Sequence, residues 1–304
     1  MIKLDGHTIN CGIFPNGETY MDIEKGLVYV TKHTATIELH FQNNDDLIHL
    51  KFLRDYLVDE LGNNLKIKLV LPYIPYSRMD RKENNRVFSL KSFANFINSM
   101  NFDSVEVWEP HSDVSVALID KVQVINKSCD LAYQAMMEEL GLCGTAWLNS
   151  SKIFDSNNDD FSFEGLIRRA TESGIWFVYP DAGAEKRYSK QIKYKNYLTC
   201  TKHRDFDTGK ITSFQVNVGD NIDKSTFKTA IIVDDLCSKG GTFIGTAEKL
   251  RELGFNRVIL VVTHCENTIY LGDIPNGKLI DLVYTTNSIL DTNICKYDKI
   301  KVYE

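Results

Sequence analysis

The chain has 304 residues, of which 43% are hydrophobic and 25% are charged, and its formal net charge is −6. This composition is typical of a soluble globular protein with a sizeable core, and the length favours two domains. It excludes disordered and collagen-like chains and strongly basic nucleic-acid-binding proteins. No apolar run reaches the ~20 residues that a membrane helix needs, and no signal peptide is visible at the N-terminus. We therefore expect neither a membrane nor a nucleic acid as a partner.

The seven cysteines are widely spaced and form no Cys-x-x-Cys pair. An odd number with this spacing argues against both a disulfide framework and a structural zinc site. We expect a protein of the reducing cytoplasm.

Short β-rich segments alternate with helix-like segments along the chain. Strands are predicted at Lys66–Leu71, Ser104–Trp108, Gly174–Tyr179, Thr229–Val233 and Arg257–Thr263. Apolar residues at helical spacing predict helices at Ser89–Met100 and Thr242–Leu253. Strands that alternate with helices predict α/β domains with mostly parallel sheets.

Two segments about half a chain length apart share one pattern. Phe102–His111 and Phe255–His264 each follow an amphipathic helix, carry apolar residues at matching positions and end in histidine. The pattern indicates an internal duplication. Coincidence between two ordinary helix–turn–strand units is the alternative.

The most informative stretch joins two adjacent acids to a glycine-rich loop. Asp234 and Asp235 follow an apolar strand, and residues 238–242 lead into a helix. Successive backbone N–H groups at a helix start can hold an anion, and Gly240 and Gly241 allow a phosphate to come close. Carboxylates accept hydrogen bonds from vicinal hydroxyls. The natural ligand therefore has a diol near a phosphate, as ribose 5-phosphate does, whereas a solvated strand end with a turn is the alternative. The P-loop pattern is absent from the sequence.

This stretch resembles the phosphoribosyl pyrophosphate motif of type I phosphoribosyltransferases and of phosphoribosyl pyrophosphate synthetases (ribose-phosphate diphosphokinases). Further segments resemble the synthetases in the family's order: Phe14–Glu18, Pro72–Lys82, Glu109–His111, Tyr179–Gly183, Val262–His264 and Thr285–Asn287. The resemblance implies two tandem phosphoribosyltransferase-like domains, each a mostly parallel sheet flanked by helices. It also implies ATP as the diphosphoryl donor, Mg²⁺, and a homo-oligomer, either a dimer or a hexamer.

We expect an N-terminal domain on the ATP side at residues 1–148 and a C-terminal domain on the sugar-phosphate side at 149–290. A tail at 291–304 is expected to pack back on the N-terminal domain. The polar segment Ser150–Asp160 fits a linker or surface loop.

The resemblance also implies roles for individual residues. It gives ATP binding to Phe14, Asn16, Glu18, Arg78, Asp80 and Arg81. It gives sugar-phosphate binding to Asp181, Asp234, Asp235, Ser238, Lys239, Gly240, Gly241 and Thr242. It places the metal at His111 and Asp181, and catalytic cations at Lys202 and Arg204 in a mobile loop. Such cations would stabilise charge on a transferring diphosphoryl group.

Three departures from the family pattern bear on specificity. Ser238-Lys239 replaces the usual Asp-Thr of the phosphate loop, which moves the local charge toward positive. Met79 stands in place of a glutamine, and Ala184 in place of a second glycine. The altered loop favours a more anionic or larger acceptor group.

The predicted reaction is attack of an anomeric 1-hydroxyl on the β-phosphorus of ATP, with release of AMP. The acceptor is either ribose 5-phosphate, as in nucleotide biosynthesis, or ADP-ribose, as in NAD metabolism. Two alternatives are a phosphoribosyltransferase and a non-catalytic regulatory homologue of the synthetase. The segments Phe14–Glu18 and Pro72–Lys82 argue against a phosphoribosyltransferase, because that enzyme needs no ATP site. A regulatory homologue should have lost the metal and loop residues, which are present here: His111, Asp181, Lys202 and Arg204.

Overall fold

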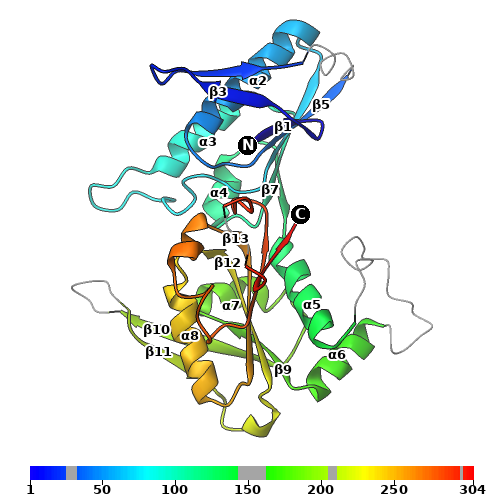
Figure 1. Cartoon of the computed structure of the whole chain (residues 1–304), viewed down its shortest axis with the longest axis vertical. Coiled ribbons are helices and arrows are strands. Elements are labelled where there is room, and N and C mark those ends of the chain that lie inside the picture. Colours follow the sequence, from blue (N-terminus) through cyan, green and yellow to red (C-terminus); the bar gives the residue numbers. More distant parts are fainter. Residues whose placement is uncertain (25–32, 143–161, 205–210, 295–296) are drawn as a thin grey trace. The chain divides into compact units, whose positions relative to one another are not determined.

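The computed structural model divides the chain into two units, Met1–Asn126 and Lys127–Glu304 (Figure 1). It describes residues 1–24, 33–142, 162–204, 211–294 and 297–304, and only the backbone of residues 203–204 and 211–213. The predicted linker at Ser150–Asp160 lies outside the described residues. No helix in the described ranges combines the length and the apolar character that crossing a membrane requires.

The first unit contains a six-stranded sheet with the order β2-β1-β5-β6-β7-β8. Its strands are β1 (Ile2–Leu4), β2 (His7–Thr8), β5 (Thr34–Leu39), β6 (Lys66–Leu71), β7 (Ser104–Trp108) and β8 (Val122–Ile125). Strands β5 to β8 run parallel, whereas β1 is antiparallel to β5 and to β2. The helices of this unit are α2 (Asp45–Leu61), α3 (Ser89–Ser99) and α4 (Asp113–Leu118).

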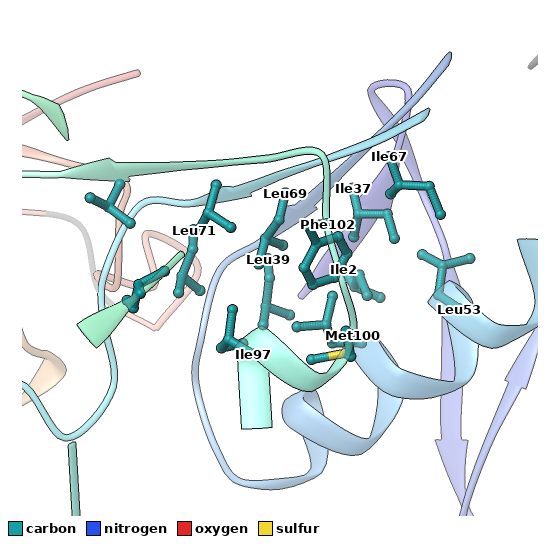
Figure 2. Packing of buried hydrophobic residues seen from close by; sticks show 14 of the residues in the cluster. Ile2, Ile37, Leu39, Leu53, Ile67, Leu69, Leu71, Ile97, Met100 and Phe102 are labelled. Atoms are coloured by element: carbon teal, nitrogen blue, oxygen red, sulfur yellow. The ribbon is translucent and has the colours of Figure 1, made fainter. Parts of the chain in front are cut away.

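The core of the first unit forms where the sheet faces its helices. Figure 2 shows Leu39 and Leu69 from neighbouring strands beside Ile97 and Met100 of the α3 region, and Leu53 on α2. These side chains are fully or almost fully buried. The apolar spacing that predicted a helix at Ser89–Met100 therefore marks the face that packs on the sheet.

A separate two-stranded hairpin, β3 (Asn10–Ile13) and β4 (Thr19–Asp22), extends from this unit. Its Cys11 and Met21 side chains pack against the core of the unit. Thr19 contacts His49 of α2, which is buried. One face of the hairpin is thus attached to the domain, because side chains alternate between the two faces of a strand.

The second unit contains a seven-stranded sheet with the order β11-β10-β9-β12-β13-β14-β15. Its strands are β9 (Ile175–Tyr179), β10 (Tyr197–Arg204), β11 (Ile211–Asn217), β12 (Thr229–Cys237), β13 (Arg257–Cys265), β14 (Leu282–Thr286) and β15 (Ile300–Tyr303). All neighbours run parallel except β10 and β11. The helices are α5 (Lys127–Glu139), α6 (Phe163–Glu172), α7 (Ala182–Tyr188), α8 (Gly241–Glu252) and the short 3-10 helices η3 (Lys224–Thr226) and η4 (Asn267–Leu271).

Both faces of the second sheet are covered. On β9, Phe177 packs with residues of α5, α6 and α7, whereas Trp176 and Val178 pack with residues of α8. Figure 1 shows α8 and the α5–α6 pair on opposite sides of the strands. A parallel sheet that is buried on both faces explains why its strands are nearly continuous apolar runs.

The chain passes from the first unit to the second at residues 126–127, whereas the predicted boundary at residues 148–149 lies outside the described residues. Helix α5 belongs to the second unit, because Ala132, Ala135 and Met136 join the core beneath β12 and β13. The expected tail at 291–304 contains β15, which pairs in parallel with β14 and is the edge strand of the second sheet. That the tail packs back on the N-terminal domain stays a prediction.

The two segments of the suspected duplication occupy matching places. Strand β7 follows α3 and lies between two parallel neighbours, β6 and β8, and β13 follows α8 and lies between two parallel neighbours, β12 and β14. Phe102 and Phe255, the first residues of the two segments, are both buried.

Candidate active site

The predicted sugar-phosphate residues gather at the carboxyl ends of parallel strands in the second unit. Asp181 follows β9, Asp234 and Asp235 lie near the end of β12, and Lys202 lies near the end of β10. Because β9, β10 and β12 run parallel, these ends share one edge of the sheet. Ligands of open α/β sheets bind at this edge.

Asp181 is the N-cap of α7. Its Oδ1 accepts a hydrogen bond from the backbone N–H of Ala184 at 2.9 Å, and its Oδ2 lies 2.6 Å from Nζ of Lys202. Burial opposes ionisation, but the Lys202 ammonium and the backbone donors outweigh it and lower the pKa of Asp181. Asp181 is therefore an ionised carboxylate that already has a cation beside it.

Asp234 and Asp235 lie within the last part of β12, which runs four residues beyond the predicted strand end at Val233. Burial, followed by the charges of Asp235 and Asp181, raises the pKa of Asp234 well above its ordinary value. The side chain of Asp235 is buried, and its Oδ2 lies 3.2 Å from Nη1 of Arg187 on α7. The two acids thus differ in surroundings, because only Asp235 has a guanidinium beside it among the ion pairs that the structure describes.

Lys202 and Arg204 lie on strand β10, not in a loop as expected. The β10–β11 hairpin is fixed to α8 through Phe214, whose ring approaches Gly245 so closely that a Cβ there would lie 2.1 Å from Cε2 of Phe214. Antiparallel pairing with β11 extends strand geometry past Lys202. The side chain of Arg204 lies outside the described residues, so its predicted role stays a prediction.

The predicted phosphate loop, residues 238–242, connects β12 to the start of α8, as the glycine pattern predicts. Gly240 is the N-cap of α8 with a φ of 86°, a conformation that favours glycine, and a Cβ there would lie 2.2 Å from Cδ1 of Ile274. A Cβ at Gly241 would meet nothing within 4 Å. The first glycine is thus required by the fold, and the second leaves open space at the helix N-terminus.

Side chains from the segment after β13 support this loop. Oγ of Ser238 lies 2.9 Å from Oγ1 of Thr268, which donates to Oε2 of Glu266 at 3.1 Å. A Cβ at Gly272 would lie 2.1 Å from the carbonyl oxygen of Lys239. Lys239 is exposed, so its ammonium is available to a ligand.

Cys237 directly precedes the loop and is fully buried. Its hydrogen bond with Cys265 on the neighbouring strand, together with burial, raises the pKa of the Cys237 thiol. The residue therefore acts as a neutral packing group and not as a nucleophile.

The predicted ATP-binding residues Arg78, Asp80 and Arg81 lie together in the first unit, at a cavity of about 160 Å³. The cavity is lined by Arg78, Met79, Asp80, Arg81, Glu83, Arg86 and Val87. Burial opposes ionisation of Asp80, but the Arg81 guanidinium, Ser112 and the nearby His111 outweigh it and lower the pKa of Asp80. His111 therefore lies close to the predicted phosphate residues of the same unit.

The predicted ATP-binding residues Phe14, Asn16 and Glu18, which the family resemblance places at the adenine site, lie at the turn of the β3–β4 hairpin. The backbone N–H of Phe14 donates to the carbonyl oxygen of Glu18 at 2.7 Å, and Gly17 has a φ of 90°. Nδ2 of Asn16 donates to Oε2 of Glu18 at 2.9 Å. The turn therefore has an ordered, exposed polar edge next to the Phe14 ring.

The structure thus brings the predicted residues together in two groups, one in each unit. Sequence reasoning missed Arg187, Thr268 and Glu266. Arg187 lies in the helix that Asp181 caps, but a basic residue there carries no distinctive sequence signal. Thr268 and Glu266 follow the predicted strand Arg257–Thr263 and could have been found by examining each residue beyond a strand end.

Comparisons with known proteins agree with this geometry. Residues 1–100 match the family described as the N-terminal domain of ribose phosphate pyrophosphokinase. A ribose-phosphate pyrophosphokinase of Sulfurisphaera tokodaii is 26% identical over 91% of this chain and 83% of its own length. Another from Pyrococcus abyssi is 26% identical over 99% of this chain and 90% of its own length.

The chain is similar to ribose-phosphate pyrophosphokinases over most of its length, and its first 100 residues match the N-terminal domain of that family. The resemblance predicted from the motifs is confirmed. The crystal structure of phosphoribosylpyrophosphate synthetase from Mycobacterium smegmatis matches with a TM-score of 0.68 and 20% identity, over 97% of this chain and 85% of that chain. This match confirms the predicted fold, two tandem phosphoribosyltransferase-like α/β domains.

Proposed function

We propose that the protein transfers the β,γ-diphosphoryl group of ATP to the anomeric 1-hydroxyl of a ribose 5-phosphate moiety and releases AMP. The observation that carries this proposal is the convergence of Asp181, Lys202, Asp234, Asp235 and the Gly240 loop at one sheet edge. The names of the relatives, which are ribose-phosphate pyrophosphokinases, support the same reaction.

The acid pair and the loop bind different parts of the acceptor. The backbone N–H groups at the start of α8 bind the 5′-phosphate beside Gly241, where no side chain fills the space. Asp234 and Asp235 bind the ribose hydroxyls, and the Arg187 ion pair holds Asp235 in place. The oxygens of the Asp234 carboxyl can accept hydrogen bonds from the diol.

Nζ of Lys202 lies 2.6 Å from Oδ2 of Asp181. An ammonium at this edge stabilises the negative charge on the transferring diphosphoryl group. Arg204 follows two residues later on the same strand and is proposed to act with it.

The donor set fits Mg²⁺. In the described ranges no three His, Cys, Asp or Glu side chains form a ready-made metal site. Mg²⁺ prefers oxygen ligands, binds few protein groups and keeps waters and phosphate oxygens. Asp181 of the second unit is proposed to bind it, and the metal role of His111 in the first unit stays a prediction. When bound, the ion neutralises the phosphate charge and lowers the pKa of the attacking hydroxyl.

The acceptor is ribose 5-phosphate or ADP-ribose. Lys239 is exposed beside the phosphate loop, and Ser238 is neutral where the family has an acid. A second phosphate on the acceptor would be attracted by the Lys239 ammonium. The proposal therefore slightly favours the bulkier ADP-ribose. The site is also proposed to work in a cytoplasmic homo-oligomer.

Incubation with ATP, Mg²⁺ and each acceptor, followed by chromatography of the nucleotides, tests the proposal. We expect AMP to form with at least one acceptor and not without acceptor. A phosphoribosyltransferase would form no AMP from ATP, and a regulatory homologue would be inactive with both acceptors. Either result would rule out the proposed reaction.

A further inference from the structure

The outer face of the β3–β4 hairpin carries two exposed aromatic rings. Phe14 is 50% exposed and Tyr20 is 37% exposed. Their ring centroids lie 4.7 Å apart, and the ring planes are inclined by 42°. Two large exposed rings in contact form a surface on which a flat ligand can stack.

Gly12 fixes the position of the Tyr20 ring. The two residues are directly paired across the hairpin, so their side-chain positions are on the same face. A Cβ at Gly12 would lie 2.3 Å from Cζ and 2.5 Å from the hydroxyl oxygen of Tyr20. The Tyr20 ring therefore lies over the backbone of Gly12, in space that only glycine leaves open.

The opposite face of the hairpin holds it on the domain. Cys11 and Met21, which are paired with each other, pack on the core, and Thr19 contacts the buried His49. Because this inner face packs on the domain, the hairpin holds the Phe14 and Tyr20 rings of its outer face in a fixed position. Asn16 and Glu18, which are hydrogen-bonded to each other, lie next to the rings at the turn of the hairpin.

We propose that Tyr20 is a specificity-determining residue of the nucleotide site. Its ring, seated over Gly12, orients Phe14 and extends the aromatic surface so that it takes a purine base. The proposal rests on the proposed function only in taking ATP as the nucleotide. Neither Tyr20 nor Gly12 belongs to the motif residues that were assigned to adenine.

Calorimetric titration with ATP and Mg²⁺, without any acceptor, tests this role. Tyr20→Leu removes the ring, and Gly12→Ala displaces it while keeping every aromatic residue. We expect each to weaken ATP binding roughly tenfold, near the low end of the effect of losing one base–aromatic stack. Tyr20→Phe should restore binding to within about twofold, since the same contact needs a ring and not a hydroxyl.

Two controls separate base recognition from general damage. Inorganic tripolyphosphate lacks a base, so its affinity should be the same for wild type, Tyr20→Leu and Gly12→Ala. Phe52→Ala removes a ring of similar exposure on α2 and should leave ATP affinity unchanged. In turnover, KM for ATP should rise while KM for the acceptor stays constant.

The inference is overturned if Tyr20→Leu and Gly12→Ala bind ATP as the wild type does. It is also overturned if both variants lose affinity for ATP and tripolyphosphate equally, because the loss would then not involve the base. AMP formation by the wild type tests the proposed reaction separately, since calorimetry requires no turnover.

Discussion

Nζ of Lys202 lies 2.6 Å from Oδ2 of Asp181, so the cation proposed for catalysis and the acid proposed for metal binding form one ion pair. The two residues come from different segments, β10 and the start of α7. The pair joins the two strand ends that flank the proposed reaction site. It also makes the ionisation of Asp181 depend on Lys202.

Replacement of Lys202 by Met should lower kcat by roughly 10²–10³, the range for loss of one group that stabilises transition-state charge. Lys202 lowers the pKa of Asp181 against the effect of burial, so the variant should also move the acidic limb of kcat/KM to higher pH. Steady-state rates measured across pH check both effects. Lys186→Met, an exposed lysine on α7, is the matched control, and an unchanged acidic limb in Lys202→Met would contradict the assigned pairing.

The two loop glycines should respond differently to alanine. Gly240→Ala combines a left-handed backbone with a Cβ 2.2 Å from Ile274, so we expect it to lower the free energy of unfolding by about 1–3 kcal/mol. Gly241→Ala has open space and should keep its stability but raise KM for the acceptor, because its methyl group would occupy the proposed phosphate position. Urea denaturation and steady-state kinetics distinguish the two. Equal stability of both variants would count against the first assignment, and an unchanged KM in Gly241→Ala against the second.

The Phe214–Gly245 contact should couple the β10–β11 hairpin to the helix that begins at the phosphate loop. Gly245→Ala would place a Cβ 2.1 Å from the Phe214 ring, so the ring and its strand must shift. We expect kcat to fall about tenfold with little change in KM, in proportion to a small displacement of Lys202. The double variant Gly245→Ala/Phe214→Ala should recover part of kcat, and no recovery would argue against this coupling.

The Ser238–Lys239 pair should set acceptor preference. Changing it to Asp-Thr lowers the local charge by about two units, and each close charge contact near a protein surface is worth on the order of 1 kcal/mol or more. The ratio of kcat/KM for ADP-ribose to that for ribose 5-phosphate should therefore fall at least about tenfold. Parallel assays of both acceptors measure it, and an unchanged ratio would remove the charge argument.

Glu138 should stabilise the second unit above pH 4.5. Burial opposes its charge, but four hydrogen-bond donors outweigh burial and lower the pKa of Glu138 from 4.5 to about 2. The donors are Gln134, Lys301, Tyr284 and Tyr303. A lowered folded-state pKa contributes stability that is present above the unfolded value and is lost as the pH falls toward 2.

Glu138→Gln should therefore lose about 1–3 kcal/mol of unfolding free energy at pH 7, as expected for hydrogen bonds to a charged group. The difference from wild type should shrink between pH 4.5 and pH 2. Thermal denaturation across this range checks the trend. Glu248→Gln on the exposed face of α8 is the control, and a difference that does not depend on pH would show that the charge of Glu138 is not responsible.

The sequence predicted the parallel strands and the phosphate loop well, because both depend on local patterns. Buried parallel strands such as Arg257–Cys265 are continuous apolar runs, and a glycine pair at a helix start is a short-range signal. The end of β12 was missed because Asp234 and Asp235 are polar, although parallel pairing with β13 carries the strand to Cys237.

Contacts between segments that are distant in the sequence could not be predicted from local patterns. The pairing of β15 with β14 and the Arg187–Asp235 ion pair join segments whose proximity depends on the finished fold. The placement of Tyr20 over Gly12 is local, but it depends on hairpin register, which a single apolar pattern does not specify.

The central claim is that a diphosphoryl group moves intact to the sugar held by the paired acids and the glycine loop. Phosphorus NMR of a reaction with ATP, Mg²⁺ and the acceptor tests it most directly, because it shows which phosphates the product carries. The account predicts AMP and a product with two linked phosphates at the anomeric carbon. ADP together with a sugar monophosphate ester, or unchanged ATP with both acceptors, would contradict it.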